Sequence, residues 1–460
     1  MPKKFNLALL LLVFVFLMTA GFSCKLFPKN EPPKKLTENI TLNFWGVWEN
    51  NSDFKEIIGD FNKVHPNIKI SYRKFRYQEY EQKLLEAWAE DRGPDLYSVP
   101  AEWLKKYKNR ITPQPNKVQL AFQEVKKTLG KTEINTILRE VPIIKSFEIK
   151  SKFVDAVYND IIIDGKIYGL PLSVDSLALF YNRDILDAAG LPTPPTNWTE
   201  VKEATKKTTL LNKDNELVQA GIALGTANNI ANAVDIISLI MMQLNTPMLI
   251  GKSVGFFNPA TGSKDKSYLP GIDALQFYTS FADPIKETYS WNEKMPNALE
   301  AFISGKVAMI YGYSYELPVI RGRAPKLNFD VAPMTQMQGA NKPLNFTNYW
   351  VTTVSHKTKS VDAAWGFLNF AASETEVKKY LNATKRPAAL RGLLTSQTGE
   401  PQLGIFAEQA LTAAHWYTGN DPLKMEEIFS ELITQFPKIT NDKELRAFTD
   451  NIMKKINLTL

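Results

Sequence analysis

The chain has 460 residues, of which 44% are hydrophobic and 22% charged, enough for two or three domains with buried cores. This composition excludes a disordered tail and a mini-protein. Most of the formal net charge of +7 comes from residues 1–35, which carry six Lys and one Glu, so the remainder is nearly neutral. A basic surface that binds nucleic acid is therefore not expected.

Residues 1–24 have the pattern of an export signal. Lys3 and Lys4 precede an apolar run over residues 7–22, and Cys24, the sole cysteine of the chain, follows it. The end of this segment resembles the lipobox of bacterial lipoproteins, although the second and third residues before the cysteine depart from the usual pattern. An uncleaved membrane helix is the alternative, because the run is close to the ~17–25 residues that span a bilayer. Both interpretations place the rest of the chain outside the cytoplasm, and lipidation of Cys24 would anchor it to the outer face of the cytoplasmic membrane.

Residues 25–38, rich in Pro and Lys, predict an extended tether. Strands are then predicted from Ile40, from Ile68 and before residue 99, with amphipathic helices between them over residues 54–64 and 77–88. Alternation of strands and helices predicts a parallel sheet with right-handed crossovers. Such sheets bind ligands beyond the carboxyl ends of their strands, so we expect a site near residues 45–50 and 99–103.

The next strand pattern, residues 167–181, is interrupted by Pro171, and this predicts a segment that passes between two lobes. Further strands are predicted from Lys306, Phe329 and Asn348. Helices dominate from Val361 to the C-terminus. Trp88, Trp291 and Trp365 lie on helical stripes and are expected in the core.

Five segments together resemble family 1 extracellular solute-binding proteins, the maltose-binding-protein-like receptors of ABC sugar importers. They occur in the family's order between about Ile40 and Leu381, and they read FWGVWENNSDFKEIIGDFNKVHPNIKI, GPDLYSVPAEWL, DGKIYGLPLSVDSLALFYNRDILDAAGLPTPPTNWTEV, ALEAFISGKVAMIYGYS and NYWVTTVS. The resemblance implies an α/β protein with the two-lobed periplasmic-binding-protein type II fold, parallel-rich sheets, flanking helices and a three-segment hinge. Residues 345–348 lack the paired glycines often found there in the family.

The expected first lobe comprises residues 39–170 and 334–357, and the expected second lobe comprises residues 171–333 and 358–460. The hinge crossings would fall near residues 170–173, 333–343 and 355–360. The resemblance further implies a monomeric receptor that captures a small polar ligand, a mono- or oligosaccharide, and delivers it to the transmembrane subunits of an ABC importer.

A sugar site needs aromatic planes for the ring faces and polar side chains for the hydroxyls. By resemblance, the strand-end loops and the crossing segment supply such groups, and later loops add amide, hydroxyl and aromatic candidates. The candidates are Trp45, Trp48, Glu49, Glu102, Asp175, Asn228, Asn229, Tyr313, Ser314, Tyr349 and Trp416. Core packing is the alternative for Trp45, a hinge hydrogen bond for Asp175, and turn formation for the two asparagines.

Catalytic and metal-binding signatures are absent from the sequence. The three histidines are far apart without metal-ligand spacing, and there is no G-x-S-x-G, P-loop or G-x-G-x-x-G motif, so neither an enzyme nor a cofactor is expected. Two alternatives remain open. One is a receptor for another solute class, such as a peptide, polyamine or phosphoester; the other is a secreted glycosidase that uses Glu102 and Asp175.

Overall fold

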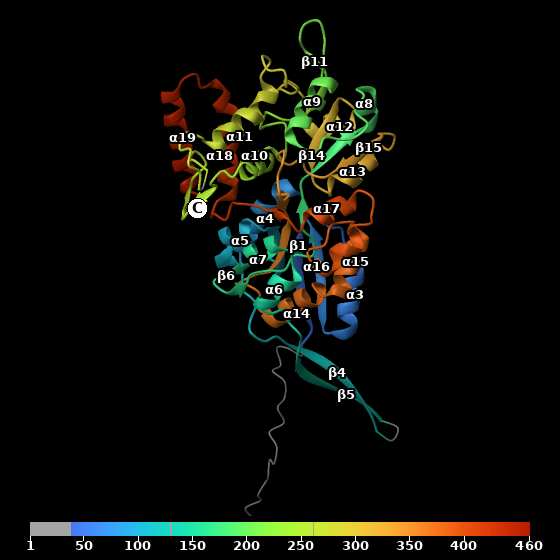
Figure 1. Ribbon diagram of the computed structural model, residues 1–460. Coiled ribbons are helices and arrows are strands. Elements are labelled where there is room, and N and C mark those ends of the chain that lie inside the picture. The colour runs from blue at the N-terminus through green and yellow to red at the C-terminus, as the bar shows by residue number, and fades with distance from the viewer. Residues whose placement is uncertain (1–37, 129–130, 261) are drawn as a thin grey trace, which may run out of the picture.

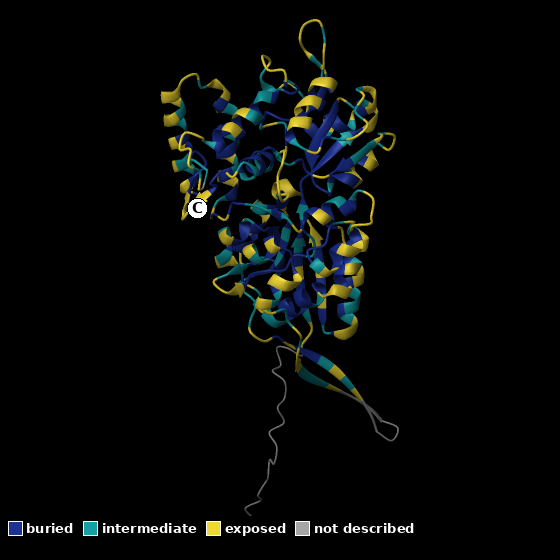
Figure 2. Cartoon of the chain, in the orientation of Figure 1, coloured by how far each residue is buried: buried dark blue, intermediate teal, exposed yellow. Residues whose placement is uncertain are grey.

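The computed structural model describes residues 38–128, 131–260 and 262–460, so the export signal, Cys24 and nearly all of the expected tether lie outside the described residues. Within these ranges the chain forms two lobes, one above the other in Figure 1, and each has its own sheet and buried core. Buried residues are concentrated inside each lobe, and exposed residues lie on the outer faces of the helices (Figure 2). None of the helices in the described ranges has the length and apolar character required to cross a bilayer.

The first lobe is built on a four-stranded sheet in the order β17-β3-β1-β2. Its parallel pairs β1–β2 and β1–β3 confirm the strand and helix alternation predicted from the sequence, while β17 pairs antiparallel with β3. Leu42 and Phe44 are buried because alternate side chains of a strand share one face. The strands are β1 (Ile40–Gly46), β2 (Ile68–Lys74), β3 (Leu96–Pro100) and β17 (Trp350–Val354). The helices include α3 (Lys55–Val64), α4 (Tyr77–Ala89), α5 (Trp103–Lys106), η1 (Lys108–Arg110), α6 (Ser146–Lys152) and α7 (Asp155–Ile161).

The second lobe is built on a five-stranded mixed sheet in the order β10-β11-β14-β9-β15. Here β11 and β14 are parallel, whereas β9 runs antiparallel to both of its neighbours. The strands are β9 (Ala178–Asn182), β10 (Leu210–Leu211), β11 (Leu217–Ile222), β14 (Val307–Gly312) and β15 (Phe329–Ala332). The helices are α8 (Arg183–Ala188), α9 (Trp198–Thr208), α10 (Ala233–Gln243), α11 (Pro270–Thr279), η2 (Ser280–Ala282), α12 (Ala298–Ile303), α13 (Glu316–Arg323), α18 (Pro422–Gln435), η3 (Phe436–Lys438) and α19 (Asp442–Asn457).

A third, small sheet connects the lobes and consists of β8 (Asp175–Ser176), β16 (Asn345–Asn348) and β18 (Ala413–Ala414). The chain leaves the first core at Val174 and enters the second at Leu177, and it returns between Phe346 and Tyr349. These two crossings lie a few residues after the expected ones. The third crossing runs through β18 and not through residues 355–360, where the family resemblance had placed it.

The expected assignment of residues 358–460 to the second lobe needs correction. Helices α14 (Val361–Ala371), α15 (Glu374–Thr384) and α16 (Arg391–Gln397) contribute their buried side chains to the first core, and α14 packs against β17 and β1. In the other direction, Met334 and Phe346 belong to the second core, although residues 334–357 were expected in the first lobe. Hydrophobic periodicity identifies the buried face of a helix but not the sheet that the face covers.

Three hairpins and helix α17 complete the elements of the described residues. The hairpin of β4 (Gln119–Thr128) and β5 (Lys131–Glu140) keeps one register over its whole length and extends away from the first lobe in Figure 1. Helix α17 (Leu403–Gln409) contacts β8 near the hinge. Two short hairpins are β6 (Ile162–Ile163) with β7 (Lys166–Ile167) and β12 (Leu249–Ile250) with β13 (Ser253–Val254).

Candidate functional site

A cavity of about 370 Å³ lies between the lobes, on the hinge side of both main sheets. The segments that follow the carboxyl ends of β1, β3 and β14 supply Trp48, Glu102 and Tyr315 to its lining. In the first lobe these segments are the strand-end loops near residues 45–50 and 99–103 where a site was expected. The lining also includes residues from the start of α10, from α18 and from the hinge strands β8 and β16.

An aromatic wall, defined here as Trp48, Tyr77, Tyr315 and Trp350, forms one side of the cavity. The ring of Trp48 stacks on that of Tyr315 with centroids 5.2 Å apart and planes 24° from parallel, which brings the two lobes into contact. Tyr77 stacks on Trp48 with ring centroids 5.9 Å apart, and Trp350 contacts Trp48 edge-on at the same centroid distance. Of these four residues the sequence analysis named Trp48. Tyr315 and Trp350 directly follow two other candidates, which is the signal that could have found them.

Asp175 is held in place by hydrogen bonds at the hinge. Its carboxylate accepts from the backbone N–H of Ser314 at 3.1 Å, from the Ser314 hydroxyl at 2.6 Å and from the N–H of Ser176 at 2.9 Å. Burial raises the pKa of Asp175 to about 6, against the opposing effect of these donors. Asp175 lines the cavity, whereas the buried Ser314 hydroxyl is occupied in positioning it.

Glu102, Asp235 and Glu426 form a second group of carboxyl side chains on the cavity wall. Burial and the neighbouring Asp235 raise the pKa of Glu102 to about 7. Burial raises that of Asp235 to about 6, although hydrogen bonds from Tyr313 and Asn348 oppose this. Burial, together with the neighbouring Glu102 and Asp235, raises the pKa of Glu426 to about 8. Asp235 is thus close enough to disfavour the ionisation of Glu102 and Glu426, and Glu102 that of Glu426.

Glu102 was among the residues predicted for the site, whereas Asp235 and Glu426 were not. Asp235 lies in the first turn of α10 and Glu426 in α18, and only tertiary packing brings these helices to the cavity. No local pattern distinguishes either residue from an ordinary charged helix position.

Two candidates support the site from behind. Tyr313 is 1% exposed, and its hydroxyl donates to Asp235 Oδ2 at 2.6 Å while its ring stacks on Tyr315 at 5.8 Å. Glu49 is also buried; it accepts from the Tyr380 hydroxyl at 2.7 Å and pairs with Arg386 at 3.0 Å. Neither Tyr313 nor Glu49 lines the cavity, but Arg386 does.

Tyr349 lines the cavity but is largely buried, and its hydroxyl donates to the carboxylate of Asp160. Asp160 also accepts from His415 at 2.8 Å. Burial alone would lower the pKa of His415, but the attraction of Asp160 outweighs it and raises the pKa to about 9. His415 and Asp160 therefore form an ion pair behind Glu102.

The remaining four candidates lie outside the cavity. Trp45 packs on Phe75 at 4.5 Å, and Trp416 is a core residue whose indole N–H donates to Ser238 at 3.0 Å. The Asn229 side chain accepts from the indole N–H of Trp291 and donates to backbone carbonyls, as expected of a loop-forming residue. Asn228 is exposed. Strand-end position identifies the loop, but not which of its side chains point into the cleft.

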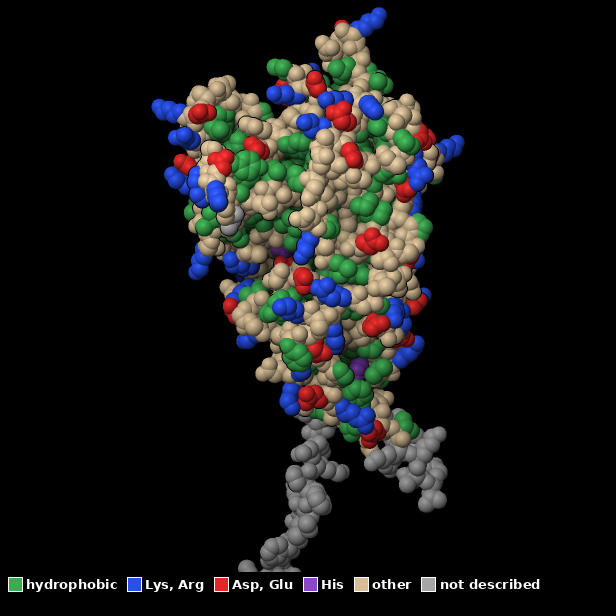
Figure 3. Space-filling model, viewed as in Figure 1, with side chains coloured by type: hydrophobic (Ala, Val, Ile, Leu, Met, Phe, Trp, Pro, Cys, Tyr) green, Lys and Arg blue, Asp and Glu red, His purple; other side chains and the backbone are tan. Residues whose placement is uncertain are grey.

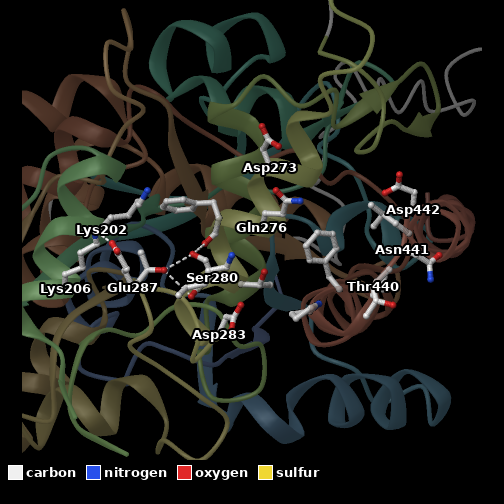
Figure 4. A pocket seen from close by; sticks show the side chains of 18 residues that line it. Lys202, Lys206, Asp273, Gln276, Ser280, Asp283, Glu287, Thr440, Asn441 and Asp442 are labelled. Atoms are coloured by element: carbon white, nitrogen blue, oxygen red, sulfur yellow. Dashed lines mark hydrogen bonds and ion pairs between the residues drawn. The ribbon is translucent and has the colours of Figure 1, made fainter. Parts of the chain in front are cut away.

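A larger cavity, about 830 Å³, is an open groove on the second lobe, between α9, α11, η3 and α19 (Figure 4). Its lining mixes both charge signs, and Lys206 is already paired with Glu287 at 2.7 Å. It lies away from the hinge and the strand ends, so we do not assign the ligand site there.

Two sheets with flanking helices, joined by a three-strand hinge around a cleft, define a type II periplasmic binding protein. The profile of the bacterial extracellular solute-binding protein family matches residues 56–402, and the chain belongs to this family. The protein is therefore a solute-binding protein of extracytoplasmic type.

Individual relatives are distant. A putative binding protein of Brucella abortus is 23% identical over 323 residues, 69% of this chain and 67% of the relative. The galactooligosaccharide-binding protein of Bacillus subtilis is 22% identical over 386 residues, 82% of this chain and 80% of the relative. Among solved structures, the cyclic alpha-maltosyl-1,6-maltose binding protein of Arthrobacter globiformis superimposes with a TM-score of 0.68 at 18% identity, covering 91% of this chain and 98% of that one.

Proposed function

We propose that the protein captures a carbohydrate in the cavity between its lobes and delivers it to the transmembrane subunits of an ABC importer. The observation that carries this proposal is the presence of the aromatic wall and four carboxyl side chains in the lining of one cavity. A sugar ring has C–H faces that pack on aromatic planes and hydroxyls that donate to carboxylates. The names of the Bacillus and Arthrobacter proteins support the same ligand class.

A thermal-shift screen of the purified protein against mono- and oligosaccharides tests the proposal. A bound sugar at about 100 times its dissociation constant should add roughly 2.7 kcal/mol to the free energy of unfolding, and this raises the melting temperature. Amino acids, peptides, polyamines and phosphate esters serve as the comparison set. Stabilisation by one of these classes and by no saccharide would refute the carbohydrate assignment.

The proposal includes binding without chemical conversion. Asp175 is engaged by three donors at the hinge, an arrangement that suits a fixed acceptor of ligand hydroxyls. Sugar bound to the protein should therefore be recovered intact after prolonged incubation, as checked by chromatography. Hydrolysis that depends on Glu102 or Asp175 would show a glycosidase instead.

We also propose that Cys24 carries a lipid that holds a monomeric receptor at the outer face of the membrane. Its position directly after the apolar run of residues 7–22, and the Pro- and Lys-rich stretch that follows, support this. In cells fed labelled palmitate, the wild-type protein should incorporate label and Cys24→Ser should not. Equal labelling of both proteins, or of neither, would favour an uncleaved membrane helix.

A further inference from the structure

The cavity between the lobes is lined by more carboxyl groups than cations. Glu102, Asp175, Asp235 and Glu426 lie on its wall, and the one Lys or Arg among the described lining residues is Arg386. The guanidinium of Arg386 is already paired with a carboxylate behind the wall. In the described ranges the carboxyl groups of Glu102 and Glu426 form neither a hydrogen bond nor an ion pair with another residue, so both are available to a ligand.

The nearby cations do not neutralise this excess. The charge of His415 is balanced by Asp160, and that of the lining residue Arg386 by Glu49. The buried Glu316 adds a further carboxyl group near Asp175.

The start of α10 lies on the same wall. The amides of a helix N-terminus attract anions, yet here the first turn carries Asp235. This end of the cavity is therefore also acidic, and its Asp235 is held by the Tyr313 hydroxyl. An anionic ligand would be repelled by the ionised carboxylates of this lining.

The geometry also limits the kind of cation. Among the described residues, no set of three or more His, Cys, Asp and Glu side chains is placed to hold a single metal ion. The aromatic wall lines the same cavity as these carboxyl groups, and its rings pack against one another there. Aromatic rings attract ammonium groups.

We propose that the ligand is a saccharide that carries at least one protonated amine, whose ammonium group lies between Glu102 and Glu426. This inference rests on the proposed carbohydrate function and names its chemical class. Charge-assisted hydrogen bonds from the ammonium to these carboxylates would compensate their burial.

The pKa values of the cavity acids give the binding reaction a distinct signature. Glu102 and Glu426, with pKa values raised to about 7 and about 8, are partly protonated at neutral pH in the unliganded protein. An ammonium ion favours their ionised forms, so binding should release protons. Calorimetry at pH 7 in buffers of different ionisation enthalpy measures this release.

The test compares matched saccharides that differ only in charge. Glucosamine and its oligomers are titrated beside their N-acetylated forms and the corresponding glucose oligomers, with spermidine as an amine that lacks a ring. We expect the amine-bearing sugars to bind about tenfold or more tightly than either neutral set, as for charged against neutral hydrogen bonds, and to bind more weakly as salt is added.

Two matched variants locate the effect. Glu102→Gln and Glu426→Gln keep side-chain size, and each should reduce the preference for the amine about tenfold and abolish part of the proton release. Glu427→Gln is the control, because Glu427 adjoins Glu426 in α18 but is exposed and paired with Lys424. It should leave binding and proton release unchanged.

Each outcome decides between the two proposals. Neutral sugars that bind as tightly as amine-bearing ones, or a preference that survives both substitutions, would overturn the inference and leave the carbohydrate function standing. Binding of spermidine without any saccharide, or stabilisation by no sugar at all, would overturn both.

Discussion

Trp48 is the residue on which the proposed ligand site depends most directly, because its ring contacts Tyr315 of the second lobe within the aromatic wall. Trp48→Ala or Tyr315→Ala should weaken sugar binding roughly two- to tenfold, the usual worth of one aromatic contact, while Trp48→Phe should retain most of it. Calorimetric titration measures the loss. Tyr268→Ala is the control, since Tyr268 is an exposed tyrosine that does not line the cavity. If Trp48→Ala and wild type bind the sugar equally well, the aromatic wall does not contact the ligand.

The cavity acids make the stability of the unliganded protein depend on pH. Glu102 and Glu426 have pKa values of about 7 and 8 in the folded protein, above the roughly 4.3 of an unfolded glutamate. Their contribution to the free energy of unfolding is therefore fully present below about pH 4 and is lost as the pH rises through 7 and 8. Because both side chains are half-buried and water screens them, we expect an effect on the order of 1 kcal/mol.

Substitution by glutamine isolates this effect. Without ligand, Glu102→Gln and Glu426→Gln should melt at a higher temperature than wild type at pH 8 and at nearly the same temperature at pH 4.5. Glu427→Gln should show no such difference between the two pH values. A lower melting temperature of both cavity variants at pH 8 would mean that these carboxylates stabilise the fold, and that their raised pKa values are incorrect.

Sequence alone predicts part of the site because strand ends are recognisable and side-chain direction is not. Trp48, Glu102 and Asp175 follow or join predicted strands and do line the cavity. Trp45 comes from the same loop as Trp48 but packs on Phe75. The position of Asp235 in the cavity could not be predicted, because the local sequence pattern of its helix does not show what the helix faces.

At the scale of elements, the parallel strands of the first lobe were predictable because apolar residues alternate clearly along them. The third hinge crossing was not predictable. Strand β18 has only two residues, and its partner strand β16 lies 68 positions earlier in the sequence, where Asn345 pairs with Ala413. A bridge this short has no periodicity to detect. The helices between the second and third crossings were consequently assigned to the wrong lobe.

Trp365 on helix α14 allows the contribution of this helix to the first core to be measured. Trp365 is fully buried in the first core, and its indole N–H donates to the Thr112 carbonyl at 3.1 Å. Trp365→Ala should lower the free energy of unfolding by about 3–5 kcal/mol through the cavity it leaves. Ligand affinity of the folded fraction should remain unchanged, since Trp365 does not line the site. A variant that melts like wild type but binds poorly would contradict the placement of α14 in the core.

The whole molecule combines a nearly neutral surface with an acidic cleft. Figure 3 shows both charge signs intermixed over the two lobes on the side that it displays. The unbalanced carboxyl groups lie between the lobes, where approach of the two halves without a ligand brings like charges together. A ligand that offsets this repulsion would shift the population toward a closed form.

The two lobes are expected to close about the hinge when the ligand binds. Three short strands join the lobes, so a rotation about them changes the separation of the two cores with little change inside either. Small-angle scattering should show a smaller radius of gyration at saturating ligand than without it. The control is Trp48→Ala at the same sugar concentration, which should require more ligand for the same decrease because the contact between Trp48 and the second lobe is lost. An unchanged radius of gyration at saturation, with binding confirmed by calorimetry, would show that the lobes hold a fixed arrangement and that the ligand enters a preformed cavity.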